Sequence, residues 1–103
     1  MTNYVLLYKG GGVPATEEEQ RQVMADWAGW YERLGRAVVD GGNPFGPSRS
    51  VAADGSASDG GSGMTGYSIV QADNLDAATD MARTCPIVTS GGTVEVYETF
   101  RVM

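Results

Sequence analysis

Glu95 and Tyr97 are the residues whose types and spacing best suit chemistry. Apolar and polar residues alternate from Thr93 to Arg101, which is typical of a strand with one polar face. Glu95 and Tyr97 are two residues apart in this strand, so their side chains point the same way. If that face is covered, burial disfavours the charged carboxylate, and the pair would serve as a general acid or base. The alternative is an ordinary solvated or interfacial pair.

Four other side chains are candidate ligand contacts. Tyr8 and Tyr67 lie in predicted strands and contribute if those strands face the same cleft. Trp30 lies on a predicted helix, where it forms either an aromatic wall or part of the core. Arg49 is the one cation of another predicted strand, and it either holds an anionic ligand or pairs with a carboxylate. The predicted ligand contacts are thus Tyr8, Trp30, Arg49, Tyr67 and Tyr97.

Composition and charge exclude several classes of protein. The 103 residues include 13 Asp and Glu against 7 Lys and Arg, and no histidine. A net charge of −6 repels phosphate backbones, so we expect no nucleic-acid partner. Without histidine there is no Ser-His or Cys-His nucleophile pair, and no histidine can bind a metal. We predict neither a metal site nor a bound cofactor.

Cys85 is the single cysteine, so no disulfide can form within the chain. Only Arg83 lies close enough in sequence to activate it, and the choice is between a structural thiol and a nucleophile. The N-terminal residues lack the basic and apolar regions of a signal peptide, and no apolar run reaches the roughly 20 residues of a membrane span. We expect a cytoplasmic protein with no membrane partner.

A long amphipathic helix is predicted to begin after Thr16. Thr16 and Glu19, three residues later, form a capping box. Apolar residues then recur every three or four positions on one stripe, at Val23, Trp27, Trp30, Leu34 and Val38. Gly35 either ends this helix or weakens it, and the latest plausible end is Gly41–Gly42.

The remaining elements are four strands and a second helix. The strands are predicted at Tyr4–Lys9, Ser48–Ala53, Tyr67–Ala72 and Thr93–Arg101. Residues 54–66 are rich in Gly and Ser and are expected to form a flexible connection. Asp73 or Asn74 caps the second helix, which runs from Leu75 to Arg83. Its inward residues are predicted to be Leu75, Ala78, Met81 and Ala82.

The order of these elements is β-α-β-β-α-β within one domain, residues 1–103. This order predicts a ferredoxin-like α+β fold, in which two helices cover one face of a four-stranded antiparallel sheet. The other face must be wet, hold a ligand or meet a partner. Since it would expose Tyr and Val side chains, we predict a homodimer that forms through this sheet face.

Several blocks of sequence resemble the YCII-related family and its DGPF-type branch. The blocks are Tyr4–Tyr8, the helix with Trp27 and Trp30, Gly41–Pro44, Gly66–Val70 with Ala72–Ala78, Cys85–Pro86, and Gly92–Val96. The resemblance implies a dimeric α+β barrel with a cleft for a small molecule.

The chain departs from the family pattern at two points. Of the Asp-Gly-Pro-Phe stretch that names the branch, only Asp59-Gly60 remains. The family resemblance also implies a catalytic His-Asp pair, and this chain has no histidine to supply it.

Three functions follow from these observations. The first is a homodimer that binds a small organic molecule without catalysis. The second is an enzyme of the dimeric α+β barrel type that uses the carboxylate and phenol of Glu95 and Tyr97 for proton transfer. The third is a regulatory or scaffolding module that acts through its dimer surface. An enzyme requires a closed pocket that contains a carboxylate, whereas a scaffold has a filled barrel.

Overall fold

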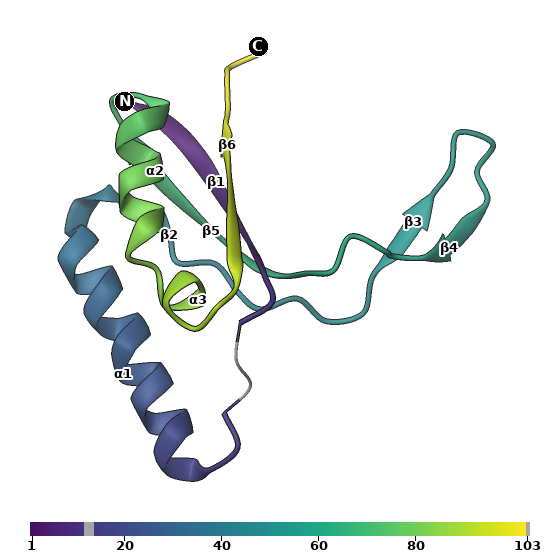
Figure 1. Cartoon of the computed structure of the whole chain (residues 1–103). Helices are drawn as coiled ribbons and strands as arrows, with labels where there is room; N and C mark the ends of the chain where they lie inside the picture. The colour runs from purple at the N-terminus through teal and green to yellow at the C-terminus, as the bar shows by residue number, and fades with distance from the viewer. Residues whose placement is uncertain (12–13, 103) are drawn as a thin grey trace.

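A four-stranded antiparallel sheet with helices on one face forms the body of the protein (Figure 1). The computed structural model describes residues 1–11 and 14–102. The elements are β1 (Thr2–Lys9), α1 (Glu17–Leu34), the 3-10 helix η1 (Gly35–Ala37), β2 (Val38–Asp40), β3 (Arg49–Val51), β4 (Ala57–Asp59), β5 (Met64–Ala72), α2 (Leu75–Arg83), α3 (Pro86–Thr89) and β6 (Thr93–Glu98). The strand order in the sheet is β2-β5-β1-β6, which confirms the ferredoxin-like α+β fold.

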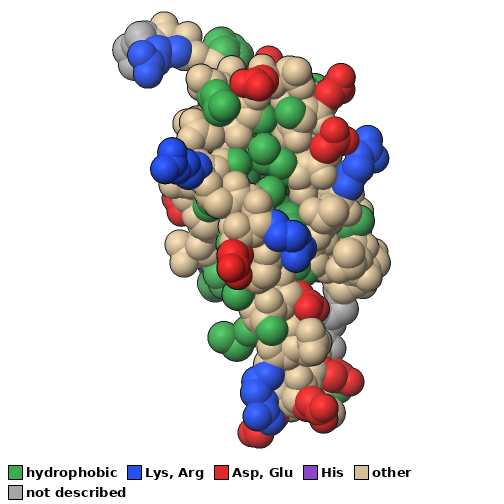
Figure 2. Space-filling view, turned by 90° about the vertical axis from the view of Figure 1, so that its left-hand side faces the viewer, with side chains coloured by type: hydrophobic (Ala, Val, Ile, Leu, Met, Phe, Trp, Pro, Cys, Tyr) green, Lys and Arg blue, Asp and Glu red, His purple; other side chains and the backbone are tan. Residues whose placement is uncertain are grey.

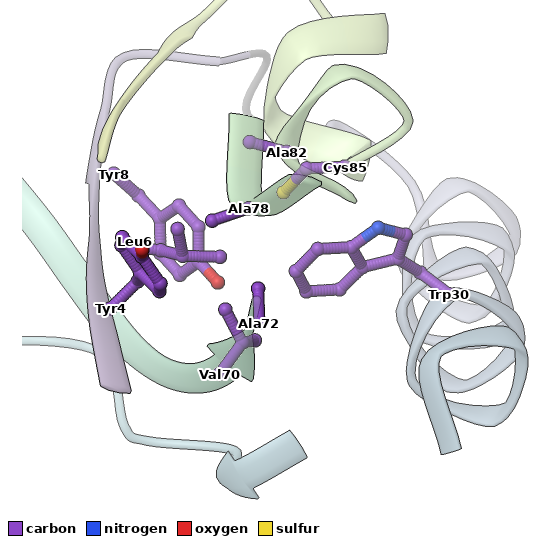
Figure 3. Packing of buried hydrophobic residues seen from close by; sticks show 9 residues of the cluster. All are labelled: Tyr4, Leu6, Tyr8, Trp30, Val70, Ala72, Ala78, Ala82 and Cys85. Carbon is purple, nitrogen blue, oxygen red and sulfur yellow. The ribbon is translucent and has the colours of Figure 1, made fainter. Parts of the chain in front are cut away.

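Strict alternation in the two central strands divides core from open surface. β1 pairs with β5 and β6, and every second side chain of β1 and β5 is buried under the helices. Figure 3 shows these side chains converging with those of α1 and α2. The core consists of Tyr4, Leu6, Tyr8, Trp30, Val70, Ala72, Ala78, Ala82 and Cys85.

The first helix begins where the sequence predicts and ends at the first of its two possible stops. Thr16 Oγ1 accepts a hydrogen bond from the Glu19 amide at 3.1 Å, and Glu19 Oε2 accepts one from the Ala15 amide at 2.8 Å. Gly35 ends the helix with φ +56°, a conformation that side chains other than glycine rarely adopt. The assignment of Val38 to the helical stripe is wrong, because the helix stops before it and Val38 begins β2.

Ser48–Ala53 is not the second strand of the sheet. That place is taken by Val38–Asp40, which pairs with β5. Val38 and Val39 are β-branched and follow the helix directly, whereas Ser48–Ala53 is mostly small and polar and has little to bury. Residues 49–51 pair instead with residues 57–59 in a separate two-stranded hairpin, so the predicted flexible connection contains a strand.

The second helix has the predicted bounds, with Asn74 as its cap. Ala78 and Ala82 are buried and Met81 packs against the core, but Leu75 is 45% exposed, so its inward placement is wrong. Leu75 is the first residue of the helix, where the chain is still leaving the sheet. The last strand ends at Glu98 and not at Arg101, although the Thr99 amide and hydroxyl still donate to the Asn3 carbonyl of β1, at 3.0 and 2.7 Å.

The hairpin of β3 and β4 forms an arm, defined here as residues 46–62, which stands clear of the body (Figure 1). Figure 1 also shows that the arm extends from the sheet in the direction away from the helices. Figure 2 views the helix side, where hydrophobic side chains lie in a central band among charged ones. No helix in the described part of the chain is long and apolar enough to cross a membrane.

Candidate functional site

The face of the sheet that points away from the helices is called the open face. Its centre carries six side chains from three adjacent strands, which we call the open-face patch: Val5, Leu7, Tyr67, Ile69, Glu95 and Tyr97. In the strand register, Leu7 lies between Tyr67 and Glu95, and Val5 lies between Ile69 and Tyr97. All six are half-buried or exposed. The patch is therefore an apolar floor with a carboxylate and two phenols around it.

Glu95 and Tyr97 lie together, as their spacing predicts. The Tyr97 hydroxyl donates a hydrogen bond to Glu95 Oε1 at 2.9 Å. This bond and the negative charge of Glu95 raise the pKa of Tyr97, because both favour the protonated phenol. Glu95 is half-buried, whereas Tyr97 is 49% exposed. The pair thus offers a carboxylate acceptor and a protonated phenol on an accessible surface.

Tyr67 reaches the same face and stacks on Phe45. Their ring centroids are 5.7 Å apart and their planes differ by 14°. The Phe45 amide donates to the Thr65 carbonyl at 2.9 Å, which fixes the segment against β5. Gly42 makes this approach possible, since a Cβ at Gly42 would collide with the Tyr67 carbonyl and its φ is +75°. Sequence reasoning missed Phe45. Its position after Asn43 and Pro44 indicates a turn, but it does not indicate that the Phe45 ring stacks on Tyr67.

Tyr8 and Trp30 lie on the opposite, helix-covered face. The Tyr8 hydroxyl donates to Ser68 Oγ at 2.7 Å, and burial raises the Tyr8 pKa well above its usual value. Trp30 is fully buried, and its indole nitrogen donates to the Met81 carbonyl at 3.1 Å. Both side chains have partners inside the core (Figure 3), which is the core-packing alternative for Trp30.

A hydroxyl cluster joins α1, β1 and β5 to the end of β2. Ser68 Oγ donates to the Gly41 carbonyl at 2.7 Å, and the Tyr31 hydroxyl donates to the same carbonyl at 2.9 Å. Tyr8 completes the cluster through Ser68. These bonds hold the turn at Gly41 and Gly42, from which the chain runs on to Phe45. The sequence carries no signal for this cluster, because its members lie in four separate segments.

Arg49 lies in β3 on the arm, outside the four-stranded sheet that carries the open-face patch. Its guanidinium is 3.6 Å from the Asp59 carboxylate, and both side chains are well exposed. This is the carboxylate-pairing alternative of the sequence analysis. The predicted ligand contacts are therefore divided among three places: Tyr67 and Tyr97 on the open face, Tyr8 and Trp30 in the core, and Arg49 on the arm.

Cys85 is buried at the end of α2, and burial raises the pKa of its thiol to about 11. A thiol in that state is a poor nucleophile at neutral pH, which favours the structural interpretation. Two hollows occur elsewhere on the described surface. One of about 780 Å³ lies beside Tyr4 and Glu98, and one of about 300 Å³ lies between α1 and α3. Among the described residues, no group of three carboxylate or thiol side chains is placed to hold a metal ion.

The comparisons with known proteins agree with this architecture. Among solved structures, the chain is similar to 5-chloro-2-hydroxyhydroquinone dehydrochlorinase (TftG) from Burkholderia phenoliruptrix AC1100, in complex with 2,5-dihydroxybenzoquinone. The two share 17% sequence identity with a TM-score of 0.55, over 95% of this chain and 93% of the other, and this likeness shows a common fold. No curated protein matches the sequence. The sequence pattern of the YCII-related domain matches residues 2–102, and the chain belongs to that family.

Proposed function

We propose that this protein is a homodimer whose two copies pack open face to open face and enclose a small organic molecule against the open-face patch. In this proposal the protein binds the molecule and does not catalyse a reaction on it. A cytoplasmic location accompanies the proposal, and the single buried thiol of Cys85 suits a reducing compartment.

The exposed area of one copy is the observation that carries the dimer. The chain has a mass of 10.8 kDa and an accessible surface of 7259 Å². A folded monomer of this mass exposes about 5,500 Å². The excess, about 1,700 Å², includes the projecting arm as well as the open face, and it is larger than the roughly 800 Å² per partner that a stable interface buries. This area is sufficient for a second copy to cover the open face in a stable interface.

The open face is also suited to pairing with itself. In a twofold dimer the same patch meets its own copy, so it must be complementary to itself. Val5, Leu7 and Ile69 form an apolar centre, which meets an identical apolar centre in the second copy. The polar groups of Glu95 and Tyr97 already bond to each other at 2.9 Å, so covering them leaves each with a partner.

The residues of the patch favour a small cyclic ligand with hydroxyl or carbonyl groups. Phe45 and Tyr67 supply stacked aromatic surface, and Leu7 lies beside Tyr67. Glu95 accepts a hydrogen bond from a ligand hydroxyl, and the Tyr97 phenol donates to a ligand carbonyl. TftG, which shares the fold, was solved with 2,5-dihydroxybenzoquinone, a molecule of this kind.

Proton transfer is the second candidate, and the half-burial of Glu95 in the single copy favours it. Glu95 takes a proton from a ligand hydroxyl, or from carbon beside a ligand carbonyl, and returns it to another ligand atom. Tyr97 stabilises the negative charge that develops in between, by donating its hydroxyl to the ligand oxygen instead of to Glu95.

Sedimentation velocity of Leu7→Glu and Leu75→Glu tests the dimer. Leu7→Glu places a charge at the centre of the open-face patch, and we expect it to raise the dimer dissociation constant at least a hundredfold. Leu75→Glu makes the same chemical change at an exposed position on α2 and serves as the matched control. Equal dissociation constants for both variants would refute dimerisation through the open face.

Titration with 2,5-dihydroxybenzoquinone tests the ligand site. We expect saturable binding that Glu95→Gln weakens and Glu32→Gln on the exposed side of α1 does not. Exchange of ligand protons with deuterated solvent, lost in Glu95→Gln, would support proton transfer. Binding without such exchange would support the non-catalytic function. Equal affinity in the unmodified chain and in Glu95→Gln would contradict both the non-catalytic and the proton-transfer proposals.

A further inference from the structure

The single copy is larger than a compact folded chain of its length. The radius of gyration is 15.2 Å, with principal extents of 46 × 37 × 19 Å. A compact domain of about 100 residues has a radius of gyration of about 13 Å. Figure 1 shows two parts that project from the body, namely the arm and the first turns of α1, in which residues 17–26 are all exposed.

The arm is too small to be stable by itself. Its two strands have three residues each, and all six of those residues are exposed. A two-stranded hairpin is at best marginally stable in water unless a third element packs on it. In the described structure the arm contacts the body only at its base, where the segments around Phe45 and Gly63 meet β5 and β1. A surface from outside this copy would stabilise the arm by packing on it.

One face of the hairpin is built for contact. Val51 lies opposite Ala57 and Arg49 opposite Asp59, so these four side chains share one face, while Ser50 and Ser58 share the other. Val51 is 71% exposed although its β-branched side chain suits a half-buried strand. The ion pair of Arg49 with Asp59 cancels the charge of this face. It therefore does not repel a partner whose net charge is −6.

The direction of the arm identifies the occupant of that face. The arm projects on the side of the sheet away from the helices (Figure 1), and its base runs through Phe45, which stacks on Tyr67 of the open face. A second copy seated on the open face lies in the space beside the arm. By twofold symmetry, the second copy's arm lies against this copy in the same way.

We infer that the arm is a clasp, which packs its Val51–Ala57 face on the second copy and holds the dimer together. This inference rests on the proposed dimer and adds a contact outside the sheet faces. The partner of residues 46–62 is another copy of this chain. The clasp also brings Arg49, which is remote from its own open-face patch, to the surface of the second copy.

Val51→Asp and Ser50→Asp test the clasp as a matched pair. Both place a carboxylate on the same strand, but on opposite faces of the hairpin. We expect Val51→Asp to raise the dimer dissociation constant about tenfold or more, and Ser50→Asp to change it less than twofold. Both positions are exposed in the single copy, so the body should fold in each variant, which the near-ultraviolet circular dichroism of the tryptophans checks.

Hydrogen exchange of the unmodified full chain gives a second readout. We expect amides of residues 49–59 to exchange at least tenfold more slowly at concentrations where the dimer is populated than at dilution. A dimer with unprotected arm amides and equal dissociation constants for both variants would overturn the clasp alone and leave the proposed function standing. A chain that stays monomeric would overturn the clasp and the proposed dimer together.

Discussion

The two faces of one sheet handle their polar and aromatic groups in different ways. On the helix face, Tyr8 and Ser68 are buried and belong to a cluster that ends on the Gly41 carbonyl. On the open face, Tyr97 is 49% exposed and bonds to the adjacent Glu95 of its own strand. The same strands supply both faces, so alternation alone sorts structural tyrosines from available ones. This contrast shows that the accessible phenol and carboxylate groups of the sheet centre lie on the open face, where we propose the ligand site.

The largest expected difference between the faces is in the free energy of unfolding that is lost when an aromatic ring is removed. Trp30→Ala leaves a cavity and removes the indole donor to the Met81 carbonyl, and we expect a loss of about 3–5 kcal/mol in the free energy of unfolding. Phe45→Ala removes a ring that is 45% exposed, and about 1 kcal/mol is expected. Urea denaturation at one fixed protein concentration measures both. Equal losses would break the contrast between a packed face and an available one.

Alkaline pH should destabilise the protein through Cys85 on the helix face. Burial raises the thiol pKa from 9.0 to about 11, so the folded state retains a proton that the unfolded state loses. The stabilisation is complete below pH 9 and declines until about pH 11, by on the order of 2–3 kcal/mol. The difference between the unmodified chain and Cys85→Ala, followed by urea denaturation across this window, isolates the thiol. Parallel curves for the two proteins would show that the thiol is not protected by burial.

The smallest expected difference compares two hydroxyl groups. Tyr8→Phe removes a buried donor to Ser68, and we expect a loss of about 1 kcal/mol in the free energy of unfolding. Tyr97→Phe removes an exposed hydroxyl and should leave that free energy unchanged in the monomer. We expect Tyr97→Phe to lower the affinity for the ligand instead. A stability loss in Tyr97→Phe at high dilution would place that tyrosine with the structural ones.

Sequence periodicity predicted most of the elements that position the open face. The capping box at Thr16, the Asn74 cap and the alternation after Thr93 all correspond to observed features. These signals are local, since each depends on residues within a few positions. The second strand was misplaced because Val38–Asp40 is only three residues long and follows a 3-10 turn, too short a run for a period to emerge.

The candidate site was predicted only where its residues share a strand. Glu95 and Tyr97 are two positions apart, so their common direction follows from the strand period. Whether Tyr8 or Tyr67 joins them depends on strand facing, which a one-residue shift reverses. The stacking of Phe45 on Tyr67 depends on the path of the chain after Gly42, and the arm depends on pairing between segments with little apolar content. Such contacts are tertiary, and no local pattern encodes them.

The covering of the open face by a second copy is the central claim, and sedimentation equilibrium of the unmodified chain tests it most directly. The proposal predicts a species of twice the 10.8 kDa chain mass at micromolar concentration, dissociating on dilution. A single species of 10.8 kDa up to about 100 µM, where even a weak dimer would form, would contradict it.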